Sequence, residues 1–518
     1  MTDPRILLRG ASVLVGEDQA PRLADLIVAG HRIADVGDPH SFDDEQVDDA
    51  VDLDGKYVLP GFIDGHCHLE LTVASLDNHL AVHTPPYRSL GDIYAFLERA
   101  RHDKPDGWII ARSSFGLQRK VVDGRLPHKD ELDRVSPGQP LVVLAGLHVA
   151  CLNSAAIHAL GLDDPSRLPG WISVDTDANG MTGVFTEVWD RLPTASAEDV
   201  VASLRAHSIP LFSRAGTTSL STIPTSSEDV RALHRLARSG ELPFRVRFYV
   251  HVPRTATLDD VISWGPESGF GDDRLRFGGV KIFVDGEGAD AYGVERDDSK
   301  WELAQLTEFI RKADAAGIQV MMHAVTPEAV RMACNSVIGA RQDATRPSRV
   351  RHRIEHGADY MDVADAGLAA RASVGLVATP HFAMSAETHR PYFQPLRSLI
   401  DAGHRIIGAS DSTGTVPEGV APLNNISAAA ARLTPDGRPS PHRTSILEGV
   451  RMFTSWAARG VSEENEKGTI APGRLADLVV LDADPFSVRP EEVASITVDR
   501  TIVGGRAVTF SHRDRLGH

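Results

Sequence analysis

The chain has 518 residues, of which 42% are hydrophobic, 24% charged and 6% aromatic, a composition typical of a folded globular protein. This composition excludes disordered, collagen-like and low-complexity proteins. A formal net charge of −17 would repel phosphate backbones and anionic lipids, so we expect no nucleic-acid or membrane partner and instead a small-molecule substrate.

The cysteines and the N-terminal segment indicate where such a chain would be found. Cys67, Cys151 and Cys334 are far apart and odd in number, as expected of reduced thiols rather than a disulfide framework. Charged residues interrupt the first apolar stretch, so we predict no signal peptide. No apolar run reaches the roughly 20 residues that a membrane helix needs. We therefore expect a cytoplasmic protein, and the sequence leaves its oligomeric state open, with a homodimer as one possibility.

Both ends of the chain consist of short β-type runs broken by turns. These runs cover residues 6–15, 24–36 and 50–58 at one end, and residues 476–481 and 494–510 at the other. Because each run alternates apolar and polar residues, one face of it needs a partner sheet. We predict that residues 1–58 and 470–518 fold together as a small β-sandwich domain.

Between these ends, β-type segments alternate with amphipathic helical segments, which is typical of a parallel sheet. We predict eight strands, at residues 58–66, 217–222, 245–251, 279–284, 318–324, 351–357, 376–381 and 405–411. Eight such units predict an α/β fold, a (β/α)8 TIM barrel over residues 59–469. An insertion of about 69–216 follows the first strand, and we expect it to cap the mouth of the barrel.

The predicted strands end in polar residues of a particular kind. These are His66 and His68, Lys281, His323, His356 and Asp411. Catalytic groups of barrel enzymes converge at the C-terminal ends of the strands. His66 and His68 are two residues apart, so on a strand they point to one face and can bind one cation, whereas Cys67 points away. Each residue alone has an ordinary explanation, as a packed histidine or a turn cap. Together they predict a catalytic divalent metal, zinc first, with iron or manganese as alternatives.

These residues lie in segments that resemble a known family. Residues 59–68, Leu-Pro-Gly-Phe-Ile-Asp-Gly-His-Cys-His, resemble the opening barrel strand of the amidohydrolase superfamily, and the chain resembles its amidohydrolase 3 (YtcJ-like) branch nearly from end to end. The supporting segments are residues 148–156, 280–286, 322–324, 353–357, 409–411 and 468–478.

The resemblance implies a centre of one or two ions. In it His66 and His68 bind the more buried ion, His323 and His356 bind the more exposed one, and Asp411 takes part in both ligation and catalysis. Lys281 would bridge the ions as a carboxylated lysine. A buried ammonium beside a divalent metal is costly, and a carbamate would replace that repulsion by two oxygen ligands. The alternative is an ordinary lysine paired with Asp285 or Glu287.

The expected activity is metal-dependent hydrolysis of a C–N bond, most simply in an amide or N-acyl compound. The metal would polarise the carbonyl and lower the pKa of bound water from roughly 15.7 toward about 7, and Asp411 would accept the proton and pass it to the leaving nitrogen. Four further residues are candidates for contact with substrate: His148 in the insertion, Glu70, Arg353 and His381.

Two alternatives remain from the sequence. A deaminase or another cyclic C–N hydrolase would use the same metal site, but deaminases typically carry an HxxE segment after the fifth strand, where this chain has His323-Ala324-Val325-Thr326. A metal-free binding barrel is the second alternative, and the joint presence of all the ligand types speaks against it. The same position also departs from the Gly-Asp pair usual in the branch, so we expect the substrate to differ from those of its better-known members.

Overall fold

An eight-stranded parallel sheet forms the centre of the molecule. The computed structural model describes residues 4–17, 20–103, 106–113, 116–285, 301–342, 348–384, 394–413, 417–434 and 436–510. The central sheet has the order β19-β18-β17-β16-β15-β14-β13-β6. Its strands are β6 (Phe62–Cys67), β13 (Thr217–Thr222), β14 (Arg245–His251), β15 (Leu275–Phe283), β16 (Gln319–His323), β17 (Arg353–Glu355), β18 (Gly375–Ala378) and β19 (Ile406–Gly408).

The first and last of these strands meet. A Cβ placed on Gly65 of β6 would lie 2.7 Å from the carbonyl oxygen of Gly408 in β19, so the two backbones are in close contact there. The sheet thus curls round into a barrel. The predicted (β/α)8 fold is confirmed, with one strand of the central sheet inside each of the eight predicted segments or overlapping it.

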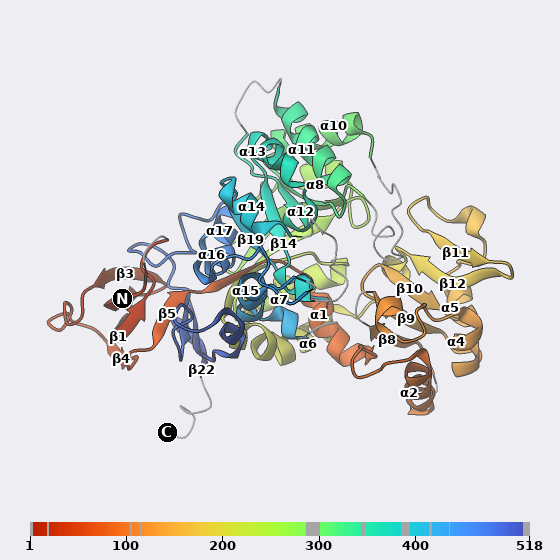
Figure 1. Ribbon diagram of the computed structural model, residues 1–518, viewed down its shortest axis with the longest axis horizontal. Helices are drawn as coiled ribbons and strands as arrows, with labels where there is room; N and C mark the ends of the chain where they lie inside the picture. Colours follow the sequence, from red (N-terminus) through yellow and green to blue (C-terminus); the bar gives the residue numbers. More distant parts are fainter. Residues whose placement is uncertain are drawn as a thin grey trace.

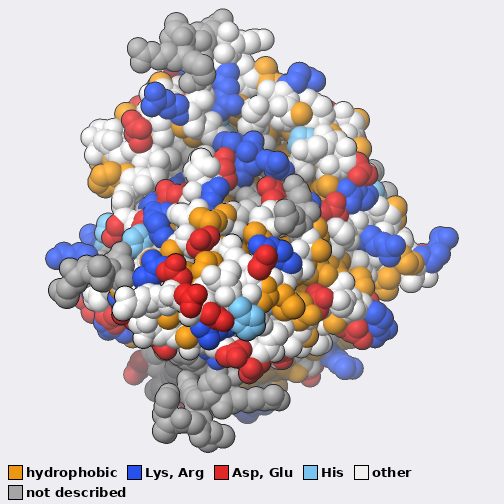
Figure 2. All heavy atoms as spheres, turned by 90° about the vertical axis from the view of Figure 1, so that its left-hand side faces the viewer, with side chains coloured by type: hydrophobic (Ala, Val, Ile, Leu, Met, Phe, Trp, Pro, Cys, Tyr) orange, Lys and Arg blue, Asp and Glu red, His pale blue; other side chains and the backbone are white. Residues whose placement is uncertain are grey.

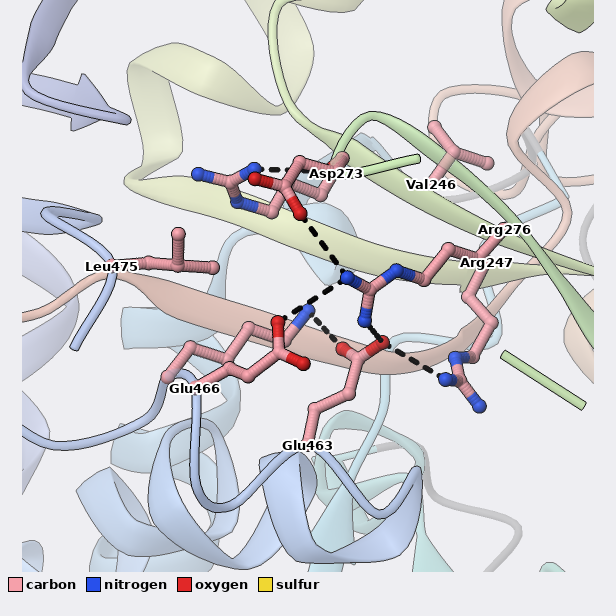
Figure 3. A pocket seen from close by; sticks show the side chains of 9 residues that line it. Val246, Arg247, Asp273, Arg276, Glu463, Glu466 and Leu475 are labelled. Atoms are coloured by element: carbon pink, nitrogen blue, oxygen red, sulfur yellow. Dashed lines mark hydrogen bonds and ion pairs between the residues drawn. The ribbon is translucent and has the colours of Figure 1, made fainter. Parts of the chain in front are cut away.

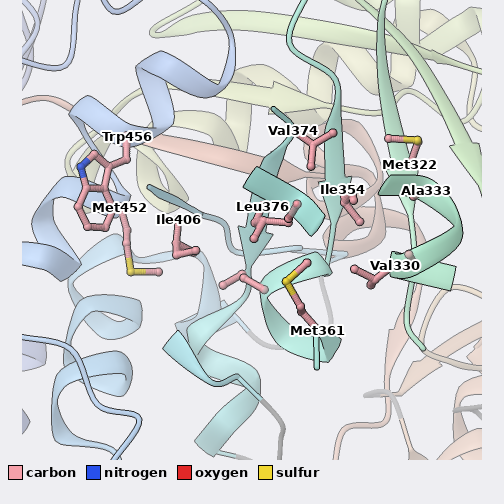
Figure 4. Packing of buried hydrophobic residues seen from close by; sticks show 14 of the residues in the cluster. Met322, Val330, Ala333, Ile354, Met361, Val374, Leu376, Ile406, Met452 and Trp456 are labelled. Atoms are coloured by element: carbon pink, nitrogen blue, oxygen red, sulfur yellow. The ribbon is translucent and has the colours of Figure 1, made fainter. Parts of the chain in front are cut away.

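Helices surround this barrel and bury its outer face. They are α1 (Leu69–Asn78), α6 (Ala197–Leu211), α7 (Ser227–Ser239), α8 (Leu258–Trp264), α10 (Leu303–Ala315), α11 (Pro327–Gln342), α12 (Gly357–Tyr360), α13 (Ala366–Ala372), α14 (Leu396–Asp401), α15 (Pro422–Ala431), α16 (Ile446–Met452) and α17 (Ser455–Gly460). Figure 4 shows side chains of the strands, such as Ile354 and Leu376, packed among helix side chains such as Val330 and Met452. Burial of this apolar layer fixes the strand ends on which the candidate site is built.

Strands from both ends of the chain share a second sheet. Its order is β22-β21-β20-β5-β1-β2-β3, and β4 also pairs with β1. The strands are β1 (Arg5–Val13), β2 (Arg22–Ala29), β3 (Arg32–Gly37), β4 (Asp49–Asp52), β5 (Tyr57–Pro60), β20 (Leu478–Leu481), β21 (Val498–Val503) and β22 (Arg506–Phe510). The first half of β1 pairs with β4 and its end pairs with β5, so one connected sheet branches at β1.

The insertion after β6 forms a third, six-stranded sheet with the order β11-β12-β10-β9-β8-β7. Its elements are β7 (Leu80–Ala81), α2 (Leu90–Asp103), β8 (Ile109–Ser113), α3 (Leu117–Lys120), α4 (Lys129–Val135), β9 (Leu141–Ala145), β10 (Val149–Leu152), α5 (Ser154–Ala159), β11 (Val174–Asp177) and β12 (Gly180–Thr186). In Figure 1 this sheet and the sheet of the chain ends lie on opposite sides of the barrel.

The surface mixes charges of both signs. On the face shown in Figure 2, acidic and basic side chains are interspersed with hydrophobic ones. Among the described residues, no helix has both the length and the apolar character needed to cross a membrane.

Candidate functional site

The predicted ligand residues meet at the C-terminal end of the barrel. His66 lies near the end of β6 and His68 follows it, while His323 ends β16 and His356 follows β17. Asp411 comes three residues after β19. Between the two histidines of β6, the Cys67 thiol turns away and donates to the Ser221 carbonyl oxygen at 3.5 Å.

His66, His68 and Asp411 form the tightest group. One ligand atom from each of them lies within 4.8 Å of the others. Asp411 Oδ1 is 3.4 Å from His66 Nε2 and 3.6 Å from His68 Nε2. The backbone supports this arrangement, because the Asp411 N–H donates to the His66 carbonyl oxygen at 2.8 Å and the His68 N–H donates to that of Ser412 at 2.9 Å.

The second carboxylate oxygen of Asp411 faces the other histidine pair. His356 Nε2 lies 3.9 Å from Asp411 Oδ2. The rings of His323 and His356 are 4.9 Å apart at their centroids. Asp411 therefore sits between the histidines of the first barrel strand and those of the fifth and sixth.

The protonation states of His66 and Asp411 suit a divalent metal. Burial, followed by the nearby Lys281, lowers the pKa of His66 to about 3, so its imidazole is neutral. Burial opposes ionisation of Asp411, but contacts with His68, His66 and His356 outweigh it and hold its pKa below the ordinary value. Neutral imidazoles and an ionised carboxylate are the donors that zinc, iron and manganese bind. The residues present therefore fit such an ion.

Glu355 and Arg353 hold His66 from behind. Glu355 Oε2 is 2.6 Å from His66 Nδ1, which leaves Nε2 directed at Asp411. Arg353 donates to both Glu355 oxygens, at 3.0 and 2.8 Å, and to the Gly65 carbonyl oxygen at 2.6 Å. The sequence analysis missed this role of Glu355, although Arg353 and Glu355 are two residues apart on one strand and must share a face. Arg353, a substrate candidate in the sequence, is placed in the barrel interior with Glu355.

Lys281 is fully buried on β15 without a carboxylate partner among the described residues. Its Nζ lies 5.1 Å from the centre of the Phe283 ring. Burial lowers its pKa to about 8, although Glu355 and Asp411 act in the opposite direction. The carboxylate of Asp285 instead accepts hydrogen bonds from the Val325 N–H and the Thr326 hydroxyl. Glu287 lies outside the described residues.

Glu70 and His381 occupy separate surroundings. Glu70, in the first turn of α1, accepts a hydrogen bond from the Thr222 hydroxyl at 2.7 Å, and burial raises its pKa to about 8. His381 belongs to the short 3-10 helix η5 (Pro380–Met384), and its backbone N–H donates to Asn425 Oδ1 at 3.1 Å.

His148 reaches the barrel from the insertion. Its ring centroid is 5.6 Å from that of Phe283, and its Nδ1 is 3.1 Å from Glu187 Oε1. Glu187 follows β12 and also accepts a hydrogen bond from Arg254, at 2.8 Å. The sequence analysis missed Glu187, Arg254 and Phe283 because contacts between the insertion and the barrel depend on how the two dock, which no local pattern in the chain indicates.

Comparisons with known proteins agree with the resemblance found in the sequence. A family model described as the amidohydrolase family matches residues 49–509. The N-substituted formamide deformylase of Arthrobacter pascens is 27% identical over 93% of this chain and 94% of its own length. The putative amidohydrolase YtcJ of Bacillus subtilis (strain 168) is 26% identical over 88% of this chain and 90% of its own. The solved structure of an uncharacterized metal-dependent hydrolase from Pyrococcus horikoshii OT3 has a TM-score of 0.72 at 22% identity and covers 94% of this chain and 99% of that one.

Proposed function

The chain belongs to the amidohydrolase family, whose members hydrolyse C–N bonds, and we propose that it cleaves the C–N bond of a small N-acylated amine at a divalent metal centre. The observation that carries this proposal is the position of Asp411, with one oxygen 3.4 Å from His66 Nε2 and the other 3.9 Å from His356 Nε2. One carboxylate at that position could act as a ligand to an ion held by either histidine pair.

The proposed ligands are His66, His68, Lys281, His323, His356 and Asp411. Zinc is the metal we favour, as one or two ions, with iron and manganese as alternatives. A bound ion of this kind would supply a Lewis acid that polarises the scissile carbonyl and lowers the pKa of water. Glu355 would fix the orientation of the His66 ring through the hydrogen bond to its Nδ1.

Asp411 is the proposed proton carrier. Its depressed pKa keeps the carboxylate ionised at neutral pH, so it can accept a proton from the attacking water. The same oxygen would then return that proton to the leaving nitrogen. His148, which Glu187 holds at the edge of the Phe283 ring, is the substrate contact that we propose from the insertion.

Lys281 is the proposed bridging ligand in its carboxylated form. The reaction joins Nζ to the carbon of CO₂ and releases one proton, and a pKa of about 8 leaves part of the amine neutral for it. We expect Lys281→Ala to lose metal and activity, and short carboxylic acids to restore part of both. An unmodified ammonium group at this position in a crystal structure of the metal-loaded enzyme would contradict the proposal.

The relative from Arthrobacter pascens supports N-acylated amines as the substrate class, because its name refers to N-substituted formamides. The decisive experiment is a matched panel of N-formyl and N-acetyl derivatives of one arylalkylamine, with an aminopyrimidine as the deaminase substrate. We expect release of the free amine, loss of activity with a chelator, and its return with zinc. His66→Ala should lose both metal and activity, whereas His158→Ala, at an exposed position, should keep them. Ammonia from the aminopyrimidine alone would favour the deaminase, and full activity without metal would refute the proposal.

A further inference from the structure

A second cluster of polar and aromatic side chains lies next to the proposed metal ligands. His251 ends β14, and in the parallel ladder it pairs with Lys281 on β15. Its ring centroid lies 5.2 Å from that of Phe283, which in turn lies 4.6 Å from that of His323. The Phe283 ring is therefore in contact with both His251 and a proposed ligand, His323.

His251 is buried with both ring nitrogens unsatisfied. His251 is only 4% exposed, and neither its Nδ1 nor its Nε2 has a hydrogen-bond partner among the described residues. An imidazole offers at least one N–H donor, and a buried donor without a partner costs free energy. His251 ends β14, whereas the proposed ligands lie on or directly after β6, β15, β16 and β17, or in the segment after β19, so it is not one of them.

Arg254 contributes a second unsatisfied donor to the same cluster. Its Nη2 donates to Glu187 Oε2 at 2.8 Å, while its buried Nη1 has no partner among the described residues. The Arg254 guanidinium lies 4.6 Å from the centre of the Trp189 ring, and the His251 ring packs edge-on against the same indole at 5.5 Å. Both donor side chains thus contact Trp189, and burial, followed by the nearby Arg254 charge, lowers the pKa of His251.

Glu187 fixes this arrangement from the insertion. Its Oε2 also accepts a hydrogen bond from Trp189 Nε1 at 3.2 Å, and its Oε1 faces His148 Nδ1 at 3.1 Å. Both oxygens of the Glu187 carboxylate are therefore in contact with protein side chains, and the carboxylate orients Arg254 without occupying its Nη1. The two ring nitrogens of His251 and Nη1 of Arg254 therefore have no acceptor within the described part of the chain.

We propose that His251 and Arg254, packed on Trp189, form a subsite that binds a carboxylate of the substrate. A carboxylate accepts only, and its two oxygens can take one hydrogen bond from each side chain. The inference rests on the proposed function and narrows it, because the substrate would be an N-acylated amine that carries a carboxylate close to the C–N bond. Phe283 and Trp189 provide the apolar walls beside that group.

The test uses a pair of ligands that differ only in this carboxylate and that the enzyme does not hydrolyse. N-methanesulfonyl-phenylalanine and N-methanesulfonyl-phenethylamine meet both conditions, and their binding to the metal-loaded protein is measured by calorimetry. We expect the carboxylate to improve the dissociation constant at least tenfold. His251→Phe and Arg254→Met should each reduce this preference to within about twofold with metal content unchanged. Tm should also stay unchanged in His251→Phe, which removes no hydrogen bond of the described structure. Arg205→Met, at an exposed ion pair with Glu241, should keep the full preference.

The binding measurements test the subsite, and the amine-release panel tests the proposed function. Equal binding of the two ligands, or no binding of either, would overturn the subsite, as would a full preference in both variants of the cluster. Failure of the proposed function is read separately, from the amine-release panel. A carboxylate preference without amide hydrolysis would refute the function alone, and hydrolysis without any carboxylate preference would refute the subsite alone.

Discussion

Asp411, the proposed proton carrier, has an unusual backbone conformation. Its φ is +47°, in the left-handed region that asparagine and aspartate enter more readily than other residues with a side chain. Asparagine is therefore the substitution that preserves the backbone and removes only the charge. His356 has a φ of +62° as well, so two of the proposed ligands sit in conformations that a regular strand does not provide.

We expect Asp411→Asn to lower kcat by about 10²- to 10⁴-fold, the usual contribution of a general base or acid. The neutral amide cannot accept the proton from water, and the backbone should remain as it is. Steady-state kinetics on the best substrate of the amine-release panel, with circular dichroism and metal analysis alongside, measures this. If the variant kept its metal and more than about a tenth of the wild-type rate, the proton-transfer role would belong to another group, and His381 would be examined first.

Some residues of the site could be predicted from the sequence, and others could not. His66, His68, His323, His356 and Asp411 could be predicted because each stands where a β-type run ends, and the ends of parallel strands meet. Glu187 and Trp189 could not, since both follow a strand of the insertion, and their contact with Arg254 arises only from docking. His251 ends a predicted strand too, but a single histidine there has no partner in the sequence that would mark it.

The centres of the barrel strands could be predicted from apolar runs, whereas the ends of the strands could not. The sixth strand is expected over 351–357 and observed as Arg353–Glu355, and the eighth is expected over 405–411 and observed as Ile406–Gly408. The chain leaves the strand conformation before His356 and Asp411, whose positive φ values turn the side chains toward the centre of the site. Hydrophobic periodicity reports the buried run and is insensitive to this turn.

Closure of the barrel between β6 and β19 depends on glycine. A Cβ on Gly65 would lie 2.4 Å from the Ile407 side chain and 2.7 Å from the Gly408 carbonyl oxygen, and the backbone atom cannot move aside easily. We expect Gly65→Ala to destabilise the protein by about 1–3 kcal/mol through overpacking. Thermal unfolding in the presence of excess zinc measures the loss.

Gly170→Ala is the matched control for this prediction. A Cβ at Gly170 would meet no heavy atom within 4 Å, and its φ is not positive. That variant should unfold at the wild-type temperature. Equal Tm values for both variants would show that the first and last strands are not in close contact at Gly65.

A buried network of ion pairs around Glu463 joins the C-terminal segment to the barrel. Glu463 accepts hydrogen bonds from Arg247 and Arg276, both at 2.8 Å, and pairs with Lys467 at 2.7 Å. Figure 3 shows Glu463 pointing toward these arginines beside a small pocket. Burial would raise the pKa of Glu463, but Lys467, Arg247 and Arg276 hold it well below its ordinary value of 4.5.

Loss of the Glu463 charge should therefore be costly and dependent on pH. We expect Glu463→Gln to destabilise the protein by about 3–5 kcal/mol at pH 7, because the buried Arg247 and Lys467 lose their carboxylate partner, whereas Arg276 keeps Asp273 and Glu466. A depressed pKa means that the carboxylate stabilises the fold above its unfolded pKa and less as pH falls below it. The difference in stability between wild type and variant should thus narrow below about pH 4.5, as denaturant unfolding at several pH values would show.

An exposed ion pair provides the control. Glu241 pairs with Arg205 on the surface, and Glu241→Gln should leave stability almost unchanged. A Glu463→Gln variant as stable as this control would show that the network does not hold the C-terminal segment in place.

The sheet of the chain ends is coupled to the site through one strand. β5 pairs with β20 in the antiparallel register Leu59 with Val479, and one residue after β5 the chain enters β6, which carries His66. Asp477, at the start of this C-terminal part, accepts two hydrogen bonds from the buried Arg245 of β14. The C-terminal strands thus cover an apolar strand that leads directly into the barrel.

Truncation of the chain before Gly468 should consequently abolish folding rather than catalysis alone. The deletion exposes the apolar edge of β5 and leaves Arg245 buried without its carboxylate, and unpaired strand edges promote aggregation. We expect the truncated protein to be insoluble, as judged by the soluble fraction after expression, whereas Asp411→Asn, which leaves the fold intact, should stay soluble. A soluble truncated protein with normal metal content and activity would mean that residues 1–58 and 470–518 do not form a common domain on which the barrel depends.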